Sequence, residues 1–215
     1  MNITLNRNEL LAALMFASDD DARFVLCGIK VEVKKHKQPV LIATDGRRLV
    51  VIESSADLDN LPDESGEFVL RSDFIKPICQ LSKASGGKLF PWIRLELKKG
   101  SKRVNVELLG CKLFVQADDN ALVEGKFPEW RQVIPAKGTE IKPVQDIGVN
   151  AQYVGEFTKA AKLLGSDEPL ISMGFTSQDG VIQVRVSTLS SLYAAIMPCK
   201  RSEQPTNYQP SFLNL

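Results

Sequence analysis

The fold of this chain is indicated most directly by residues 40–52, Val40-Leu41-Ile42-Ala43-Thr44-Asp45-Gly46-Arg47-Arg48-Leu49-Val50-Val51-Ile52. Two short apolar runs flank an Asp-Gly pair, and this pattern predicts two antiparallel strands joined by a tight turn. Two consecutive arginines follow the turn. We therefore expect a β-hairpin that carries basic side chains at its mouth.

Around this hairpin, one pattern recurs three times: a short strand, an amphipathic helix and three further strands. The first unit has a strand at 3–5, a helix to about residue 17, and strands at 24–33, 40–43 and 49–52. The second has a strand at 67–70, a helix capped by Ser72, and strands at 93–97, 104–108 and 113–117. The third has a strand at 147–149, a helix over 151–164, and strands at 170–175, 181–186 and 192–197.

Each predicted helix has an apolar stripe at helical spacing, so the three helices are expected to bury one face each. The stripes consist of Leu10, Leu11, Leu14 and Met15, then Phe74, Ile75, Ile78 and Leu81, then Tyr153, Val154, Phe157 and Leu164. The pattern predicts an α+β fold in which helices pack on one face of antiparallel sheets. The alternative is an ordinary α+β domain in which the repetition is a coincidence.

The composition restricts the classes of function. The chain has 215 residues, with 44% hydrophobic and 25% charged residues, which is usual for a soluble globular protein. It contains no apolar run long enough to span a membrane and no secretory signal at its N-terminus, so we expect a cytoplasmic protein. The formal net charge is +1, which argues against nucleic-acid binding by bulk charge alone.

No cofactor or metal site is predicted. The only histidine is His36, which makes a common zinc site and a Ser-His-Asp triad unlikely. The four cysteines are far apart and form no CxxC pair, so they are expected to be reduced thiols: Cys27, Cys79, Cys111 and Cys199.

Several stretches of the sequence resemble a known family, the bacterial sliding clamp, which is the beta subunit of DNA polymerase III. Residues 43–49 (ATDGRRL) resemble the clamp signature ATDGHRL, and residues 23–28 (RFVLCG) are similar to its RYYLNG strand. Residues 124–135 (EGKFPEWRQVIP) are close to DGRFPDYRRVLP, which closes the clamp's middle domain. Residues 149–154 and 193–200 resemble the start of its last helix and its terminal YVVMPMRL.

The resemblance implies a DNA clamp fold in an abridged form. A family subunit has three domains of two βαβββ units each, whereas three units are expected here. Residues 1–136 are predicted to form a complete clamp domain like the family's middle domain. Residues 137–200 are predicted to form half a domain, like the end of its last domain, and residues 201–215 a flexible tail. This points to a compact mobile-element version or a specialised paralogue.

The resemblance further implies a non-enzymatic processivity factor that encircles double-stranded DNA and slides without reading its sequence. Sliding favours non-specific phosphate contacts from helices that line the hole. The candidate DNA-binding residues are Arg23, Phe24, Lys76, Lys83, Lys159 and Lys162. The run Asp19-Asp20-Asp21 departs from the family pattern and adds negative charge beside Arg23. For the lysines, the alternative is that they are ordinary solvated side chains.

A hydrophobic pocket that binds QLxLF-type peptides of polymerases and the clamp loader is also implied. The matching positions are Leu26, Thr44, Gly46, Arg47, Arg48, Leu49, Pro128, Val133, Ala195 and Met197. Apolar walls with a basic rim suit a peptide anchored by two large side chains. Arg47 replaces the family's histidine and Gln132 a second arginine, so the preferred peptide is expected to differ. For Leu26, Leu49 and Met197 the alternative is core packing.

Self-association is a further expectation. Family rings contain twelve βαβββ units, so three units per chain would need four chains, joined head to tail through edge strands. A tetramer is the arithmetic expectation, with an open or monomeric form as the alternative. Residues 209–215 (QPSFLNL) loosely resemble a clamp-binding peptide, and we hypothesise that this tail occupies a pocket, its own or a neighbour's. The alternative is a disordered terminus.

Two other functions remain as alternatives. The first is a clamp-like protein that does not encircle DNA and binds replication partners as a decoy or regulator. The second is an enzyme, for which Asp45 with Arg47 and Arg48 would be the candidate cluster. No plausible nucleophile, base or metal-ligand set accompanies that cluster, so the enzyme is the weaker alternative.

Overall fold

The structure is a computed structural model of the whole chain. It describes residues 1–55, 61–84, 91–98, 100–101, 103–109, 113–116, 120–136, 138–140, 147–177 and 179–199.

The elements occur in the order that the repeats predict. The first unit comprises β1 (Asn2–Asn6), α1 (Arg7–Leu14), a 3₁₀ helix η1 (Asp21–Leu26), β2 (Gly28–Val33), β3 (Val40–Thr44) and β4 (Arg48–Glu53). The second comprises β5 (Gly66–Arg71), α2 (Ser72–Ala84), β6 (Trp92–Leu97), β7 (Val104–Leu108) and β8 (Leu113–Gln116). A 3₁₀ helix η3 (Trp130–Val133) precedes α3 (Ala151–Leu163), β9 (Ile171–Phe175), β10 (Ile182–Val186) and β11 (Leu192–Ile196).

The first two units exchange their lead strands. β1 pairs with β6 of the second unit, and β5 pairs with β2 of the first unit, both antiparallel. Gly28 makes the second pairing possible, because a Cβ atom at this position would lie 2.4 Å from the Leu70 carbonyl oxygen. The exchange interlocks the two units, so neither can complete its sheet alone.

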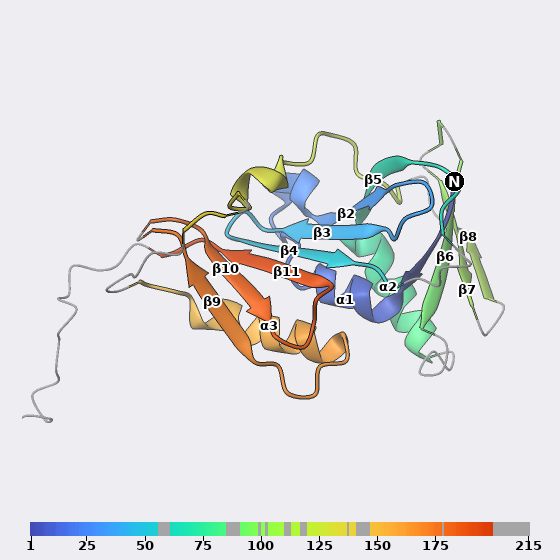
Figure 1. The fold of residues 1–215 in the computed structure, drawn as a ribbon. Helices are drawn as coiled ribbons and strands as arrows, with labels where there is room; N and C mark the ends of the chain where they lie inside the picture. Colours follow the sequence, from blue (N-terminus) through green and yellow to red (C-terminus); the bar gives the residue numbers. More distant parts are fainter. Residues whose placement is uncertain are drawn as a thin grey trace, which may run out of the picture.

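The strands form two antiparallel sheets, a four-stranded sheet in the order β1-β6-β7-β8 and a seven-stranded sheet in the order β5-β2-β3-β4-β11-β10-β9. β11 joins the third unit to the first by pairing with β4, from Leu192 opposite Ile52 to Ile196 opposite Arg48. The hairpin of β3 and β4 therefore lies in the middle of the longer sheet, beside the strands of the third unit (Figure 1).

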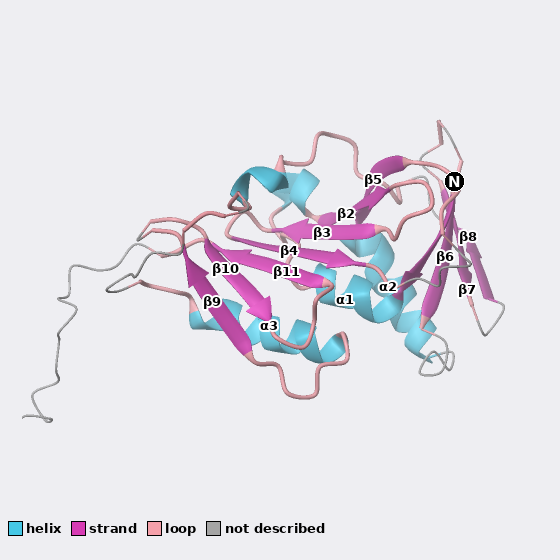
Figure 2. Cartoon of the chain, viewed as in Figure 1, coloured by secondary structure: helices cyan, strands magenta, loops and turns pink. Residues whose placement is uncertain are grey.

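The three helices lie on one side of the seven-stranded sheet (Figure 2). α1 lies between the other two and packs against both α2 and α3. Phe16 just after α1 meets Phe157 of α3 with ring centroids 4.9 Å apart, and both rings are fully buried. This arrangement confirms the predicted α+β fold, with helices on one face of antiparallel sheets.

Side-chain caps fix where two of the helices begin. The Asn6 side chain accepts a hydrogen bond from the Asn8 backbone N–H (2.8 Å), and Asn150 accepts one from Gln152 (2.9 Å). The first helix ends earlier than predicted, at Leu14 instead of about residue 17.

The predicted strand at 24–33 is wrong in its first half. Residues up to Leu26 form η1, because the Asp20 side chain accepts hydrogen bonds from the Ala22 backbone N–H and from the Arg23 side chain. These local bonds stabilise a helical turn instead of an extended strand. The strand begins only at Gly28.

Two further expectations need correction. Leu81 is 39% exposed and lies outside the buried stripe of α2. The buried positions of this helix are Ile75, Ile78, Cys79 and Ser82. The predicted strand at 147–149 is reduced to one bridge between Gly148 and Cys199. No described helix is long and apolar enough to cross a membrane.

Candidate functional site

The turn between β3 and β4 is held by Asp45. One carboxylate oxygen, Oδ1, accepts hydrogen bonds from the backbone N–H groups of Arg47 (2.9 Å) and Arg48 (3.0 Å). Gly46 has φ of +85°, a left-handed conformation that glycine adopts at little cost. The Thr44 hydroxyl donates to the Arg48 carbonyl oxygen (2.7 Å) and closes the turn. The Asp-Gly signature therefore encodes a rigid turn, and the carboxylate of the candidate enzymatic cluster is engaged in building it.

Arg48 points from this turn toward the helices. Its Nε atom donates to Asp45 Oδ2 (2.9 Å), and its Nη2 atom donates to the Met15 carbonyl oxygen (2.9 Å). Its Nη1 atom contacts the Glu156 carboxylate, and its guanidinium lies 4.7 Å from the centre of the Tyr153 ring. The side chain is 9% exposed. Arg48 thus joins the hairpin to the end of α1 and to α3.

Arg47 points outward and is exposed. Its backbone is fixed on both sides, because its N–H donates to Asp45 and its carbonyl oxygen accepts from the Met197 N–H (2.7 Å). The neighbouring Tyr153 side chain, together with the charge of Asp45, raises the pKa of Arg47. Arg47 is therefore a fully charged group at a fixed place.

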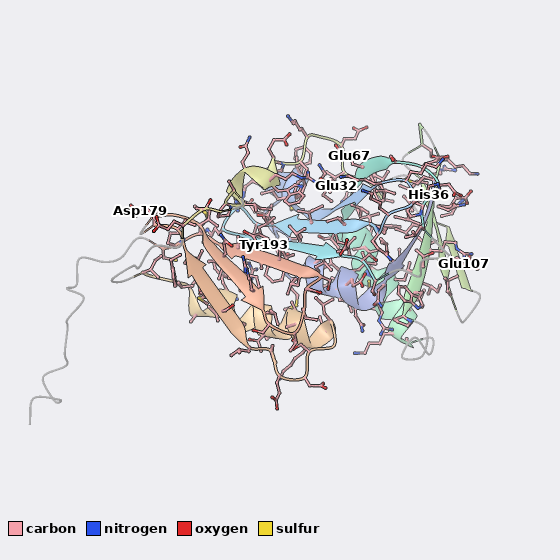
Figure 3. All side chains as sticks on the ribbon, in the orientation of Figure 1. Glu32, His36, Glu67, Glu107, Asp179 and Tyr193 are labelled. Atoms are coloured by element: carbon pink, nitrogen blue, oxygen red, sulfur yellow. The ribbon has the colours of Figure 1, made fainter. Side chains whose placement is uncertain are left out.

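The segment that carries η3 is fastened to β2 through Glu32. The Glu32 carboxylate accepts hydrogen bonds from Trp130 Nε1 (2.9 Å) and Arg131 Nη1 (3.0 Å). Lys30 lies between Glu32 (3.4 Å) and Glu67 (3.1 Å), and Figure 3 shows the two glutamates on neighbouring strands. Burial acts to raise the pKa of Glu32, but the hydrogen bonds from Arg131 and Trp130 and the charges of Arg131 and Lys30 outweigh it and lower this pKa to about 2.

A cavity of about 220 Å³ opens between the hairpin, β11 and the end of η3. Its lining is largely apolar, and Arg47 and Arg48 are the charged residues among the described residues that line it. The lining residues are Thr44, Gly46, Arg47, Arg48, Leu49, Val133, Val181, Ala195, Ile196 and Met197. Eight of the ten pocket residues that the sequence predicts are therefore in one cavity.

The other two predicted pocket residues lie elsewhere. Leu26 is buried behind the cavity, in an apolar cluster with Leu49 and Ala195, and Pro128 is exposed and does not line it. Val181 and Ile196 also line the cavity and are not among the predicted pocket residues. Ile196 lies between two predicted positions, whereas only the pairing of β10 with β11 brings Val181 near. Met197 is 41% exposed at the rim, so the core-packing alternative does not hold for it.

The four candidate lysines are exposed on two helices. Lys76 and Lys83 lie on α2, and Lys159 and Lys162 lie on α3. α1 separates the two pairs and carries no lysine. Its Arg7 is 6% exposed and donates a hydrogen bond to the Asn8 side chain. The positive charge of the helix layer is thus divided between its two sides.

Arg23 and Phe24 have strongly acidic surroundings. Arg23 is paired with Asp20 (3.0 Å) and donates to the Asp45 carbonyl oxygen (2.9 Å), and Phe24 is 56% exposed. Phe24 and Lys76 line a second, larger cavity of about 530 Å³, whose acidic lining residues are Asp19, Asp21, Asp73 and Glu124. This cavity is polar and carries more acidic than basic residues, so its charge does not favour phosphate groups.

The cysteines that the structure describes are free thiols. Burial raises the pKa of Cys79 to about 12, and burial together with Asp21, Asp20 and Asp19 raises the pKa of Cys27. Cys199 is exposed, and Cys111 lies outside the described residues. Within the described part of the chain, no group of three or more potential ligands is placed to bind a metal ion.

Comparisons with known proteins give the fold. No family model and no curated protein matches the chain. Among solved structures, the C. crescentus beta sliding clamp matches with a TM-score of 0.68 and 15% identity over 93% of this chain. The Thermotoga maritima DNA polymerase III beta subunit matches with 0.67 and 16% over 94%. A sliding clamp from Bartonella birtlesii, bound to griselimycin, matches with 0.66 and 17% over 93%.

This chain spans 66% of the length of each of these three clamps. The agreement covers nearly all of this chain, including both interlocked units and the strands that extend their sheet. The chain therefore has the fold of the bacterial DNA polymerase III beta sliding clamp.

Proposed function

We propose that this protein is a sliding-clamp-like processivity factor that encircles duplex DNA and docks polymerase or clamp-loader peptides in a hydrophobic pocket. The observation that carries the proposal is the fold itself, in which the helices form one layer and the strands the other. A ring of such subunits with its helices inward has a wall of sheets and a helical lining. The proposed complex involves no membrane, no cofactor and no catalytic residue.

The proposed DNA contacts are the exposed lysines of α2 and α3, Lys76, Lys83, Lys159 and Lys162. Flexible lysine side chains on helices make phosphate contacts that carry no sequence information, which suits a protein that slides. Arg23 and Phe24 stay in the proposal as residues at the edge of the hole. Their acidic neighbours argue for a minor contribution from both.

The proposed peptide site is the cavity of about 220 Å³ beside the hairpin. Its volume suits one or two large apolar side chains, and its walls come from four separate segments of the chain. Leu49, Val133 and Met197 supply apolar surface, and Val133 and Met197 are the exposed members that an incoming side chain would cover. Leu26 supports Leu49 from behind.

The proposed ring is built head to tail from this chain, with a tetramer as the expected number. The exchanged lead strands support residues 1–136 as one complete domain, and the third unit supports residues 137–200 as half a domain. The longer sheet ends in β5 and β9, and residues 121–123 already pair with the outer edge of β5. The proposed edges for another copy are therefore β9 of the longer sheet and β1 or β8 of the shorter one.

Binding of a fluorescein-labelled peptide that contains Gln-Leu-Ser-Leu-Phe tests the docking part. We expect Leu49→Ala and Met197→Ala to weaken binding several-fold, and Leu170→Ala, an exposed leucine outside the cavity, to leave it unchanged. Equal binding by all four proteins would overturn the assignment of the pocket.

The second candidate function is a clamp-like decoy or regulator that binds replication partners without encircling DNA. It is favoured by the absence of lysine from α1 and by the acidic cavity beside α2. The two functions differ in their behaviour on DNA, because a ring stays on closed circular plasmid and slides off linear DNA. A decoy is retained on neither.

A further inference from the structure

The two arginines of the hairpin turn have different surroundings. Arg48 is directed inward and meets the carboxylates of Asp45 and Glu156, so its charge is compensated inside the molecule. Arg47 is directed outward and meets the hydroxyl of Tyr153. No carboxylate in the described part of the chain lies within ion-pair distance of the Arg47 guanidinium.

Asp45 is the acidic group nearest to Arg47 in sequence, but the side-chain hydrogen bond that its carboxylate accepts comes from Arg48. Its Oδ1 atom accepts from the two backbone N–H groups of the turn, and its Oδ2 atom accepts from Arg48 Nε. It therefore offers Arg47 a nearby charge and no side-chain hydrogen bond. The guanidinium keeps donors available for an additional acceptor.

Arg47 is also held in place at the cavity rim. Its backbone is bonded to Asp45 on one side and to Met197 on the other, and its side chain lies beside Tyr153. Because Arg47 is the uncompensated one of the two charged lining residues, the rim has a net positive charge beside apolar walls.

We propose that Arg47 makes the pocket select peptides that carry an aspartate or glutamate next to their apolar anchor. The proposal rests on the proposed peptide-docking function and adds a specificity-determining residue to it. The anchor fills the apolar cavity, and the adjacent carboxylate accepts hydrogen bonds from the Arg47 guanidinium. A lysine at the same peptide position meets a like charge.

Three labelled peptides that differ at one position test the proposal, with Asp, Asn or Lys as the third residue of Gln-Leu-x-Leu-Phe. Fluorescence anisotropy gives the Kd of each. At low salt, we expect the wild-type protein to bind the Asp peptide about 2- to 5-fold more tightly than the Lys peptide, because Arg47 is exposed to solvent. At 0.5 M salt the ratio should fall toward one.

Arg47→Glu should reverse the order and favour the Lys peptide. Tyr153→Phe keeps the ring and removes the hydroxyl beside Arg47. It should reduce the preference in Kd for the Asp peptide over the Lys peptide, and leave the Kd of the Asn peptide unchanged. Lys37→Glu is the matched control, since it makes the same change of charge at an exposed turn away from the cavity. It should leave the ratio unchanged.

The outcomes separate this inference from the function on which it rests. If the wild-type protein binds all three peptides with equal affinity, or if Arg47→Glu keeps the wild-type ratio, the role of Arg47 is wrong and the pocket stands. If no peptide binds the wild-type protein, the docking function falls and the inference falls with it.

Discussion

At the residue scale, the Asp-Gly turn directs Arg48 toward the helices and leaves Arg47 exposed at the rim of the cavity. The spacing of Asp45 and Gly46 predicts the turn, and the structure adds the hydrogen bonds that make it rigid. The different tasks of Arg47 and Arg48 could not be predicted. They depend on Tyr153 and Glu156, which lie about a hundred positions away and reach the turn only when α3 packs on α1.

Arg48→Ala should destabilise the protein by about 2–3 kcal/mol, because it leaves two partly buried carboxylates without their partner. Arg47→Ala removes an exposed side chain from the same turn and should leave the free energy of unfolding unchanged. Urea unfolding followed by circular dichroism measures both variants. Equal stability of the two proteins would contradict the different tasks of the arginines.

Glu32 provides a test that depends on pH. Its pKa in the folded state is about 2, below its ordinary value of 4.5, so its stabilising effect is complete above pH 4.5 and is lost as the pH falls toward 2. Glu32→Gln should cost about 1–2 kcal/mol at pH 7, a figure reduced for the partial exposure of its partners, and should make stability less sensitive to acid over that interval.

The control for Glu32 is Glu107→Gln, since Glu107 makes a cross-strand ion pair with Arg94 (2.8 Å) on the shorter sheet. This surface pair should contribute less than about 1 kcal/mol. If the Glu32 variant follows the same pH curve as the wild type, the network around Trp130 and Arg131 does not fasten the η3 segment.

At the element scale, hydrophobic spacing predicted most helices and strands, and the errors have local causes. The predicted strand at 24–33 loses its first part to η1, because side-chain hydrogen bonds of Asp20 favour a turn that periodicity does not reveal. The predicted stripe of α2 includes Leu81 wrongly. Ile75 and Ile78 are compatible with a stripe that continues to Leu81 and with one that continues to Cys79 and Ser82, and the second is the buried one. The exchange of β1 and β5 was not predicted, because strand pairing depends on contacts distant in sequence.

The lysines of α2 and α3 should neutralise DNA phosphates. Replacing Lys159 and Lys162 by alanine, or Lys76 and Lys83, should weaken duplex binding for every sequence. The negative slope of log K against log salt should become shallower, by up to about 0.9 for each phosphate that is no longer neutralised. Lys35 and Lys37, exposed in the turn between β2 and β3, form the matched control pair. Equal slopes for the three double variants would contradict the assignment of the DNA-facing side.

The C-terminal segment provides another test at this scale. Residues 204–215 lie outside the described residues, so this prediction rests on the sequence QPSFLNL. A tethered competitor acts at a high effective concentration, and deleting these residues should raise the affinity for the labelled Gln-Leu-Ser-Leu-Phe peptide. Replacing Phe212, Leu213 and Leu215 by serine should have the same effect. Unchanged affinity in both variants would rule out the tail as a competitor.

At the scale of the whole molecule, one pairing decides the architecture. β11 extends the sheet of the first unit at β4, and this contact places the end of the third unit against the hairpin and completes the cavity. The sequence order of the motifs predicted that these segments meet, through the resemblance to a clamp. The register, and with it the place of Val181 in the cavity wall, required the structure.

If this protein forms a closed ring around DNA, it should stay on a duplex whose ends are blocked. A linear duplex with biotin at both ends is mixed with the protein either before or after streptavidin blocks the ends, and is then washed at high salt. Encirclement predicts retention when mixing precedes blocking, and release once a restriction enzyme cuts the duplex. No retention when mixing precedes blocking, or retention that survives the cut, would contradict encirclement.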